Sequence, residues 1–331
     1  MKRKGNLIQQ VAEWENLLTA YSKACRGKQC SRDAQNYAAD LDENLSKLQR
    51  QILSAKLDVG HYHYFKIYDP KERMICAAPF AERVLHHAVM NICHQYFDRT
   101  LIYDTYATRL EKGTYKAIER GREGCGNFKF VAKLDVRKYF DSVRHHDLKV
   151  KLARLFKDKK LLSVFNQLID SYEKTPSRGL PIGNLSSQYF ANLYLSEIDH
   201  KAKELIHVPM YIRYMDDILL FGDEKQTLRK QVDTVRQWME QIGLQLKPVQ
   251  FVPTEHGVLF LGYRIYPHKL LLSGRSKRRF TRKLRQANNA LSNCDLSEND
   301  YLNKVLPLYA FIDKAYSRQY RKRLGIEGRT A

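Results

Sequence analysis

Residues 211–221 read Tyr-Ile-Arg-Tyr-Met-Asp-Asp-Ile-Leu-Leu-Phe, with the adjacent aspartates Asp216 and Asp217 set between two runs of β-branched, aromatic and apolar residues. Pro209 and Gly222 bound this stretch, which predicts two buried strands joined by a tight turn. Neighbouring carboxylates repel by about 1 kcal/mol in water and about 4 kcal/mol at an effective dielectric of ~20, so a site that gathers them favours a cation. Oxygen ligands suit Mg²⁺. An ordinary Asp-rich turn is the alternative explanation.

A third acid, Asp135, ends another strand-like run at residues 128–134. If this strand lies beside the 211–221 hairpin, Asp135 joins Asp216 and Asp217 in a three-carboxylate cluster. Such a cluster suits two metal ions about 3.5–4 Å apart, the arrangement used for in-line nucleotidyl transfer. One ion would activate a primer 3′-hydroxyl and the other would hold the triphosphate.

Both acidic motifs resemble those of reverse transcriptases. The run Asp-Val-Arg-Lys-Tyr-Phe-Asp at 135–141 is similar to their first palm motif, and Tyr-Met-Asp-Asp at 214–217 is similar to their second acidic motif. The resemblance implies an α+β, right-hand polymerase with fingers, a palm whose antiparallel sheet is backed by helices, and a short helical thumb. It also implies catalysis and metal binding by Asp135, Asp216 and Asp217, with two Mg²⁺ ions for which Mn²⁺ can substitute.

The order of the motifs along the chain divides it into four parts. Residues 1–58 are expected to form an N-terminal helical extension and residues 59–134 the fingers. Residues 135–267 would form the palm with an interleaved fingers segment, and residues 268–331 a basic helical thumb.

The resemblance further implies a set of nucleotide-binding residues. Lys71 and Arg73 lie in the fingers segment in which a basic residue, matched here by Arg73, grips the triphosphate; the planar arginine fork suits a phosphate. Val136 follows the first catalytic acid, and Phe140 stands where the family places a ring that excludes a 2′-hydroxyl. Lys247 matches a lysine proposed to protonate the pyrophosphate. The alternatives are a core aromatic for Phe140 and a solvated charge for Lys247.

Residues 180–188 contain the most discriminating departure from the common pattern. Most reverse transcriptases show Q-G-x-x-x-S-P here, whereas this chain has Ile182, Gly183 and Gln188 in an I-G-x-x-x-S-Q pattern. That pattern is characteristic of bacterial and phage diversity-generating retroelements, and the resemblance implies error-prone, adenine-directed cDNA synthesis from a template-repeat RNA for mutagenic retrohoming. Physically, Ile182 offers a shape contact where an amide would hydrogen-bond. Packing beneath the fingers is the alternative role of Ile182.

A strongly basic composition agrees with a polyanionic partner. Lysine and arginine number 57 against 36 acidic residues, for a net charge of +21. The excess is densest in residues 275–331, which we expect to grip template RNA and the RNA/cDNA duplex in a salt-dependent way, a solvated charged face being the alternative. The expected nucleic-acid contacts are Arg275, Lys277, Arg278 and Arg279. The expected primer grip is Phe260, Leu261, Gly262 and Tyr263.

The remaining expectations concern environment and partners. Six cysteines lack paired C-x-x-C spacing, which disfavours zinc and predicts reduced thiols; they are Cys25, Cys30, Cys76, Cys93, Cys125 and Cys294. No apolar run approaches the ~20 residues of a membrane span, so a soluble cytoplasmic protein is expected. Beyond RNA and deoxynucleoside triphosphates, the resemblance implies a small, basic, helical accessory protein.

Two other functions stay open from the sequence. A retron, group II intron-like or phage-defence reverse transcriptase is the enzymatic alternative, which the I-G-x-x-x-S-Q pattern disfavours. An RNA-binding scaffold with a silent palm is the non-enzymatic alternative, and it predicts the loss of one of the three carboxylates, all of which are present.

Overall fold

A four-stranded antiparallel sheet carries the acidic turn at one end of its central strands. The structure is a computed structural model that describes residues 3–27, 31–68 and 72–326. The strand order is β4 (Met210–Tyr214), β5 (Asp217–Gly222), β3 (Phe130–Asp135) and β6 (Gln250–Pro253). The two segments that carry the acids therefore lie side by side, although they are far apart in the chain.

Helices cover both faces of this sheet. On one face, α6 (Thr114–Asn127) packs against β4 and β5; on the other, α10 (Leu185–Glu204) packs against β4, and α11 (Lys225–Gln241) against β3 and β5. The alternation of a strand sorts the side chains between these layers. Val131, Leu219 and Phe221 share a core with α6, whereas Ala132, Leu134, Ile218 and Leu220 share a core with α10 and α11.

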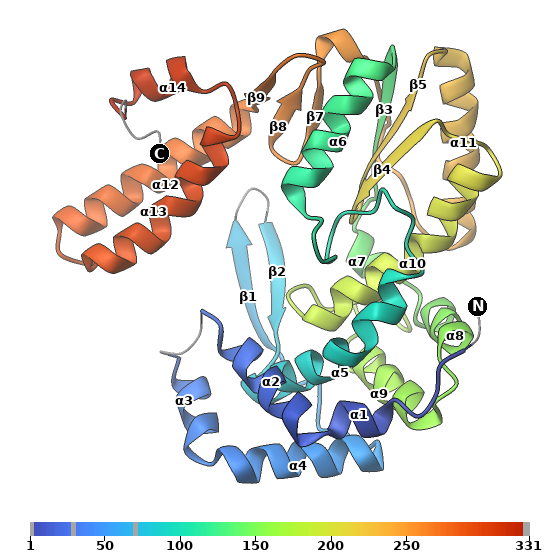
Figure 1. Ribbon diagram of the computed structural model, residues 1–331, viewed down its shortest axis with the longest axis vertical. Helices are drawn as coiled ribbons and strands as arrows, with labels where there is room; N and C mark the ends of the chain where they lie inside the picture. The colour runs from blue at the N-terminus through green and yellow to red at the C-terminus, as the bar shows by residue number, and fades with distance from the viewer. Residues whose placement is uncertain (1–2, 28–30, 69–71, 327–331) are drawn as a thin grey trace.

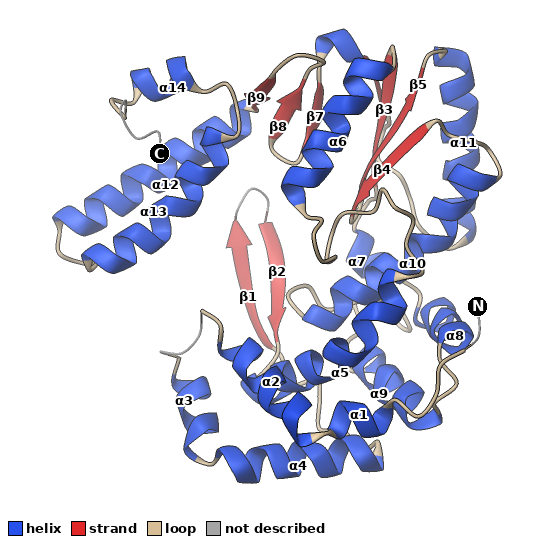
Figure 2. Cartoon of the chain, in the orientation of Figure 1, coloured by secondary structure: helices blue, strands red, loops and turns tan. Residues whose placement is uncertain are grey.

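The first third of the chain builds a helical layer below the sheet in the view of Figure 1. Helix α5 (Phe80–Asp98) is its centre, and the N-terminal helices pack against it; they are α1 (Ile8–Ala12), α2 (Trp14–Cys25), α3 (Arg32–Ala39) and α4 (Leu41–Ser54). A two-stranded hairpin, β1 (His63–Tyr68) with β2 (Glu72–Ala77), rises from this layer (Figure 2).

The segment between β3 and α10 returns to the same helical layer. It begins with the short α7 (Tyr139–Ser142) and continues with α8 (His145–Leu155) and α9 (Lys159–Asp170). Contacts of α8 with α10, and of α9 with α4, join the helix beside the central sheet to the N-terminal helices. The segment therefore lies between β3 and β4 in sequence but packs outside the central sheet.

The last third of the chain forms a second, smaller sheet and a helical projection. After η1 (Thr254–His256), strands β7 (Val258–Phe260), β8 (Tyr263–Ile265) and β9 (Leu270–Leu272) pair in that order. Helices α12 (Gly274–Ser292) and α13 (Glu298–Asp313) then extend away from the sheets side by side, with α14 (Arg318–Arg323) beside them (Figure 1).

One expected boundary, between residues 134 and 135, falls inside β3, and another, between residues 267 and 268, falls between two paired strands of the second sheet. Residues 130–134, expected in the fingers, belong to β3 of the central sheet, and α6 packs on that sheet as well. Strand β9, expected in the thumb, pairs with β8. These differences arise because cross-strand pairing joins segments irrespective of the motif order along the chain.

Within the described residues, no helix is both long and apolar enough to cross a bilayer. The five cysteines in that part of the chain are free thiols, as expected. Cys30 lies outside it.

Two glycines of α6 allow a direct test of its packing on the sheet. A Cβ on Gly124 would lie 2.8 Å from Phe221 Cζ and 2.8 Å from Met210 Sδ, whereas a Cβ on Gly126 would meet nothing within 4 Å. We expect Gly124→Ala to lower the free energy of unfolding by about 1–2 kcal/mol, because overpacking outweighs the gain in helix propensity. The matched Gly126→Ala should raise it by up to about 1 kcal/mol. Urea unfolding of both variants measures the difference, and equal effects would contradict the packing described.

Candidate active site

The register of the central sheet brings two of the three predicted acids together. Asp135 at the end of β3 pairs directly with Asp217 at the start of β5. Opposed residues on neighbouring antiparallel strands have Cβ atoms about 4.5–5.5 Å apart and project to the same face. Asp216 lies in the two-residue turn between β4 and β5, and its carbonyl accepts a hydrogen bond from Val136 N at 3.4 Å. All three carboxylates therefore lie at one end of the sheet.

Two lysines contact these carboxylates. Lys247 Nζ donates to Asp135 Oδ1 at 2.5 Å, and its backbone N–H donates to Asp135 O at 2.9 Å. Lys133 Nζ lies 3.6 Å from Asp217 Oδ1. Lys133 was not singled out from the sequence; its position two residues before Asp135, on the same face of β3, is the signal that could have identified it.

The environment of the site raises the pKa of two of the acids, Asp216 and Asp217. Burial, together with the neighbouring charge of Asp217, raises the pKa of Asp216 to about 6. Burial also raises the pKa of Asp217, with Lys133 acting in the opposite direction. A positive charge placed among these acids would favour their ionised forms.

The donor set fits divalent cations in its chemistry. The three carboxylates lie at the same end of the sheet, and oxygen ligands of this kind are what Mg²⁺ and Mn²⁺ prefer. In the described part of the chain, however, no three acid, histidine or cysteine side chains converge closely enough to enclose an ion. Lys247 contacts Asp135, and Lys133 contacts Asp217. A metal ion bound by these carboxylates would therefore have to replace some of the lysine contacts.

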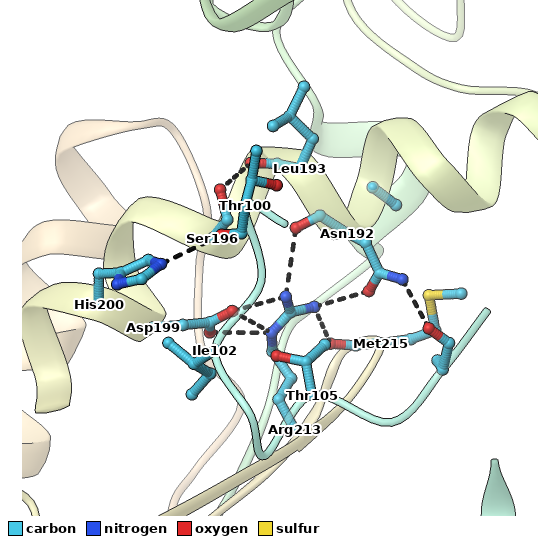
Figure 3. A network of polar contacts seen from close by, with 12 residues as sticks. Thr100, Ile102, Thr105, Asn192, Leu193, Ser196, Asp199, His200, Arg213 and Met215 are labelled. Atoms are coloured by element: carbon cyan, nitrogen blue, oxygen red, sulfur yellow. Dashed lines mark hydrogen bonds and ion pairs between the residues drawn. The ribbon is translucent and has the colours of Figure 1, made fainter. Parts of the chain in front are cut away.

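Beneath the turn lies a buried ion pair that sequence reasoning missed. Arg213 and Asp199 are both completely buried, and Arg213 Nη2 lies 2.6 Å from Asp199 Oδ2 (Figure 3). The guanidinium also donates to Asn192 Oδ1 at 3.0 Å and to Met215 O at 3.4 Å. An arginine in an otherwise apolar strand is the sequence signal that could have revealed this network.

The residues expected to hold the nucleotide lie on three different elements. Arg73 is exposed on β2. Val136 is buried, directly after Asp135. Phe140 is half-buried on α7, its ring packs against Tyr139, and its carbonyl accepts a hydrogen bond from Leu180 N at 2.8 Å. Lys71 lies outside the described residues.

The 182–188 segment connects the β1–β2 hairpin to the palm. Ile182 O accepts a hydrogen bond from Cys76 N at 2.9 Å, and its side chain is half-buried. Gly183 has φ of +119°, and a Cβ there would lie 3.1 Å from Ile75 Cγ2, so both conformation and space favour glycine. Gln188 Oε1 accepts a hydrogen bond from Thr108 Oγ1 at 3.0 Å. This contact anchors the 103–113 loop to α10.

The expected primer grip forms the β7–β8 hairpin, and the helical projection holds it. Phe260 and Tyr263 pair across the strands with buried side chains, so Leu261 and Gly262 form the tip. Gly262 O accepts a hydrogen bond from Ser276 Oγ at 2.6 Å. Tyr263 OH donates to Phe311 O at 2.7 Å, so the position of the tip follows that of α12 and α13.

Basic side chains cover the exposed surface of α12. Arg275, Lys277, Arg278 and Arg279, all expected to contact nucleic acid, are exposed there. A groove of about 490 Å³ lies between α12 and α14, and Lys277, Arg278, Arg282, Arg285 and Tyr320 are among its lining residues. Its charge suits a phosphate backbone.

Comparisons with known proteins agree with this geometry. A family model described as reverse transcriptase (RNA-dependent DNA polymerase) matches residues 68–265. The chain is 21% identical over 271 residues to Protein YkfC of Escherichia coli (strain K12), covering 66% of this chain and 71% of that protein. It is 26% identical over 132 residues to the Retron Ec73 reverse transcriptase of Escherichia coli, covering 36% and 40%. The solved structure of apo telomerase from Candida Tropicalis matches with a TM-score of 0.50 at 12% identity, covering 80% of this chain and 61% of that one.

The structural likeness confirms the polymerase fold predicted from the sequence. An antiparallel sheet covered by helices, with acids at one end of its central strands, agrees with the right-hand polymerase fold. Because the family match covers more than half of the chain, the chain belongs to the reverse transcriptase (RNA-dependent DNA polymerase) family. This family works with divalent metal ions. The chain spans less than two thirds of the retron and telomerase proteins that it matches.

The raised pKa of Asp216 predicts that its ionised carboxylate lowers the free energy of unfolding of the protein. At pH 8 the carboxylate is ionised in the folded and unfolded states, and folding places that charge in an unfavourable environment. Without divalent metal, Asp216→Asn should therefore raise the free energy of unfolding by about 1–3 kcal/mol.

The gain from Asp216→Asn should shrink as the pH falls from 6 to about 4, because the folded wild type takes up a proton before the unfolded chain does. Chemical unfolding in EDTA at pH 8 and pH 4.5 measures both values. A variant less stable than wild type at pH 8 would contradict the electrostatic explanation.

Proposed function

We propose that the chain copies RNA into DNA at the sheet end formed by Asp135, Asp216 and Asp217. The observation that carries this proposal is the direct pairing of Asp135 with Asp217 beside the Asp216 turn. This arrangement gathers negative charge on a rigid sheet, and the basic α12 offers a surface for the duplex. The family supports RNA as template and deoxynucleoside triphosphates as substrates.

In this proposal the three carboxylates hold two Mg²⁺ ions, for which Mn²⁺ can substitute. When bound, the ions lower the pKa of the primer 3′-hydroxyl and neutralise charge on the phosphates. Arg73 binds the triphosphate through its planar fork. Phe140 limits the space beside the sugar and so selects deoxynucleotides, and Val136 forms part of the same floor.

Lys247 has two roles in the proposed reaction. While it contacts Asp135 it offsets the repulsion among the acids. Its ammonium would also serve as the general acid that donates a proton to the departing pyrophosphate. The tip at Leu261 and Gly262 supports the primer strand, and Arg275, Lys277, Arg278 and Arg279 bind backbone phosphates.

Removing one acid tests whether this site performs the chemistry. We expect Asp216→Ala to reduce DNA synthesis on a primed poly(rA) template by at least about 100-fold, because the charge on the reacting phosphates loses its counterpart. Affinity for the RNA/DNA duplex should stay within about two-fold, since phosphate contacts from the thumb dominate binding. Primer extension and filter binding measure the two quantities.

The matched control is Asp223→Ala, which removes an acid just beyond the other end of β5, where Asp223 accepts a hydrogen bond from Lys129 N. It should retain polymerase activity. An Asp216→Ala protein that still polymerises would refute the assignment, whereas a wild type that binds duplex but never polymerises would favour the silent scaffold.

The finer proposal is a mutagenic retroelement polymerase that makes adenine-directed errors on a template-repeat RNA for retrohoming. It is supported by the I-G-x-x-x-S-Q pattern and by the position of Ile182, whose carbonyl is fixed to the β1–β2 hairpin while its side chain remains half-buried. An apolar side chain leaves the nucleotide without the directional contact of an amide. A small basic helical accessory protein would complete the system.

Restoring the amide tests this fidelity proposal. We expect Ile182→Gln to reduce misincorporation opposite template adenines by about tenfold, a change within the range for gaining a directional contact. Ile182→Leu, the apolar control, should keep the wild-type error spectrum. Sequencing of cDNA made on an adenine-containing RNA measures both.

A faithful wild-type polymerase would contradict the mutagenic proposal. It would favour a retron-type enzyme, the alternative that the similarity to the Retron Ec73 reverse transcriptase supports. Group II intron-like and phage-defence enzymes belong to the same alternative.

A further inference from the structure

The turn that carries Asp216 has an unfavourable backbone conformation. Strand β4 ends at Tyr214 and β5 begins at Asp217, so Met215 and Asp216 alone form the turn. Met215 has φ of +54°, in the left-handed region that residues other than glycine rarely adopt. The adjacent acids repel each other and add to the tendency of the turn to open. Something in the surrounding structure must hold it closed.

Arg213 is the buried group that contacts this turn. All its guanidinium nitrogens find acceptors: Nε and Nη2 donate to Asp199, Nη2 also to Asn192 O, and Nη1 to Asn192 Oδ1 and Met215 O. Figure 3 shows the guanidinium with Asp199 on one side and with Asn192 and Met215 on the other. The contact with Met215 O, at 3.4 Å, is the one that reaches the turn.

The backbone of Arg213 is fixed as well as its side chain. Arg213 N donates to Asp104 O at 2.9 Å, and Tyr106 N donates to Arg213 O at 2.9 Å. The same loop is held to α10 by Asn192 Nδ2, which donates to Ala107 O at 2.8 Å. A strand, a loop and a helix therefore all determine where the guanidinium lies.

The negative charge of Asp199 limits the effect that Arg213 can have on the other acids. The carboxylate of Asp199 takes three of the hydrogen bonds and neutralises the guanidinium charge within a completely buried pair. Little net charge remains to attract Asp216 and Asp217. Any effect of Arg213 on these acids must therefore come from directional hydrogen bonding, which depends on the shape of the side chain.

We propose that Arg213 is a positioning residue that holds the Met215 turn closed and thereby sets the placement of Asp216 and Asp217 for metal binding. The inference rests on the proposed function, because it assigns Arg213 to the same metal site. It predicts that the geometry of the guanidinium matters beyond its charge. Lysine would keep the pair with Asp199 but could not reach Asn192 and Met215 together.

The test measures Mn²⁺ binding by electron paramagnetic resonance on the full chain, without nucleotide. We expect Arg213→Lys to weaken Mn²⁺ binding by about 10-fold or more, as typical for groups that orient metal ligands. In primer extension, kcat should fall while KM for dTTP stays within about two-fold. Mn²⁺ affinity equal to that of wild type would overturn the inference.

A matched control separates positioning from loss of stability. Tyr211 OH also donates to Asp199 Oδ1, at 2.8 Å, but does not touch the turn. Tyr211→Phe should lower the melting temperature and leave Mn²⁺ affinity unchanged. If Tyr211→Phe weakens Mn²⁺ binding as much as Arg213→Lys does, the effect is structural and the inference is wrong.

A rescue variant tests the link through the turn. Glycine adopts positive φ without strain, so adding Met215→Gly to Arg213→Lys should recover part of the lost Mn²⁺ affinity. No recovery would overturn the inference. If Arg213→Lys does not fold, Asn192→Ala takes its place, because it removes one acceptor and keeps the Arg213–Asp199 pair.

Asp216→Ala serves as the reference for the metal site itself. If Asp216→Ala binds Mn²⁺ as tightly as wild type, the carboxylates do not hold the ion, and the proposed function fails together with this inference. If Asp216→Ala loses binding and Arg213→Lys does not, only the inference fails.

Discussion

The antiparallel pairing of β3 with β5 is the constraint on which the site depends. Its register places Asp135 opposite Asp217, where like charges destabilise a sheet. A slip of one residue would turn one of the two acids to the opposite face and bury it against helices. The hydrophobic alternation that buries Val131, Leu219 and Phe221 on one face and Leu134 and Leu220 on the other fixes the register. Core packing thus sustains an arrangement that electrostatics alone opposes.

The surrounding structure supports the acids in two different ways. At the sheet surface, Lys247 and Lys133 contact the acids directly. Below it, the pair of Arg213 and Asp199 is completely buried, and removing one partner of such a pair typically costs about 3–5 kcal/mol. The lysine contacts are partly exposed, whereas the buried pair is shielded from water. In the proposed function, a bound cation would replace the first contribution and the second would keep the acids in position.

Hydrogen bonds between distant segments connect the surroundings of the site to the β1–β2 hairpin and to the 103–113 loop. Ile182 O holds the β1–β2 hairpin, and Gln188 holds the 103–113 loop. That loop in turn contacts Arg213 through its backbone. The I-G-x-x-x-S-Q pattern is therefore connected directly to the β1–β2 hairpin and, through the 103–113 loop, to the β4–β5 hairpin. Gln188 accepts a hydrogen bond from Thr108, so Gln188 has a structural role besides the nucleotide contact predicted from the motif.

The sequence by itself determined a strand that ends in an acid and a hairpin whose turn carries two more, because apolar alternation and turn residues are local signals, and the resemblance to reverse transcriptases added the fold class. The 211–221 hairpin and the strand before Asp135 needed no knowledge of distant contacts, and the resemblance to reverse transcriptases rested on these same residues. Only the tertiary structure decided that β3 lies between β5 and β6, that Lys133 and Lys247 reach the acids, and that Arg213 is buried against Asp199. These features depend on pairing between segments far apart in the chain, where burial and hydrogen-bond partners are set by the whole fold rather than by neighbouring residues.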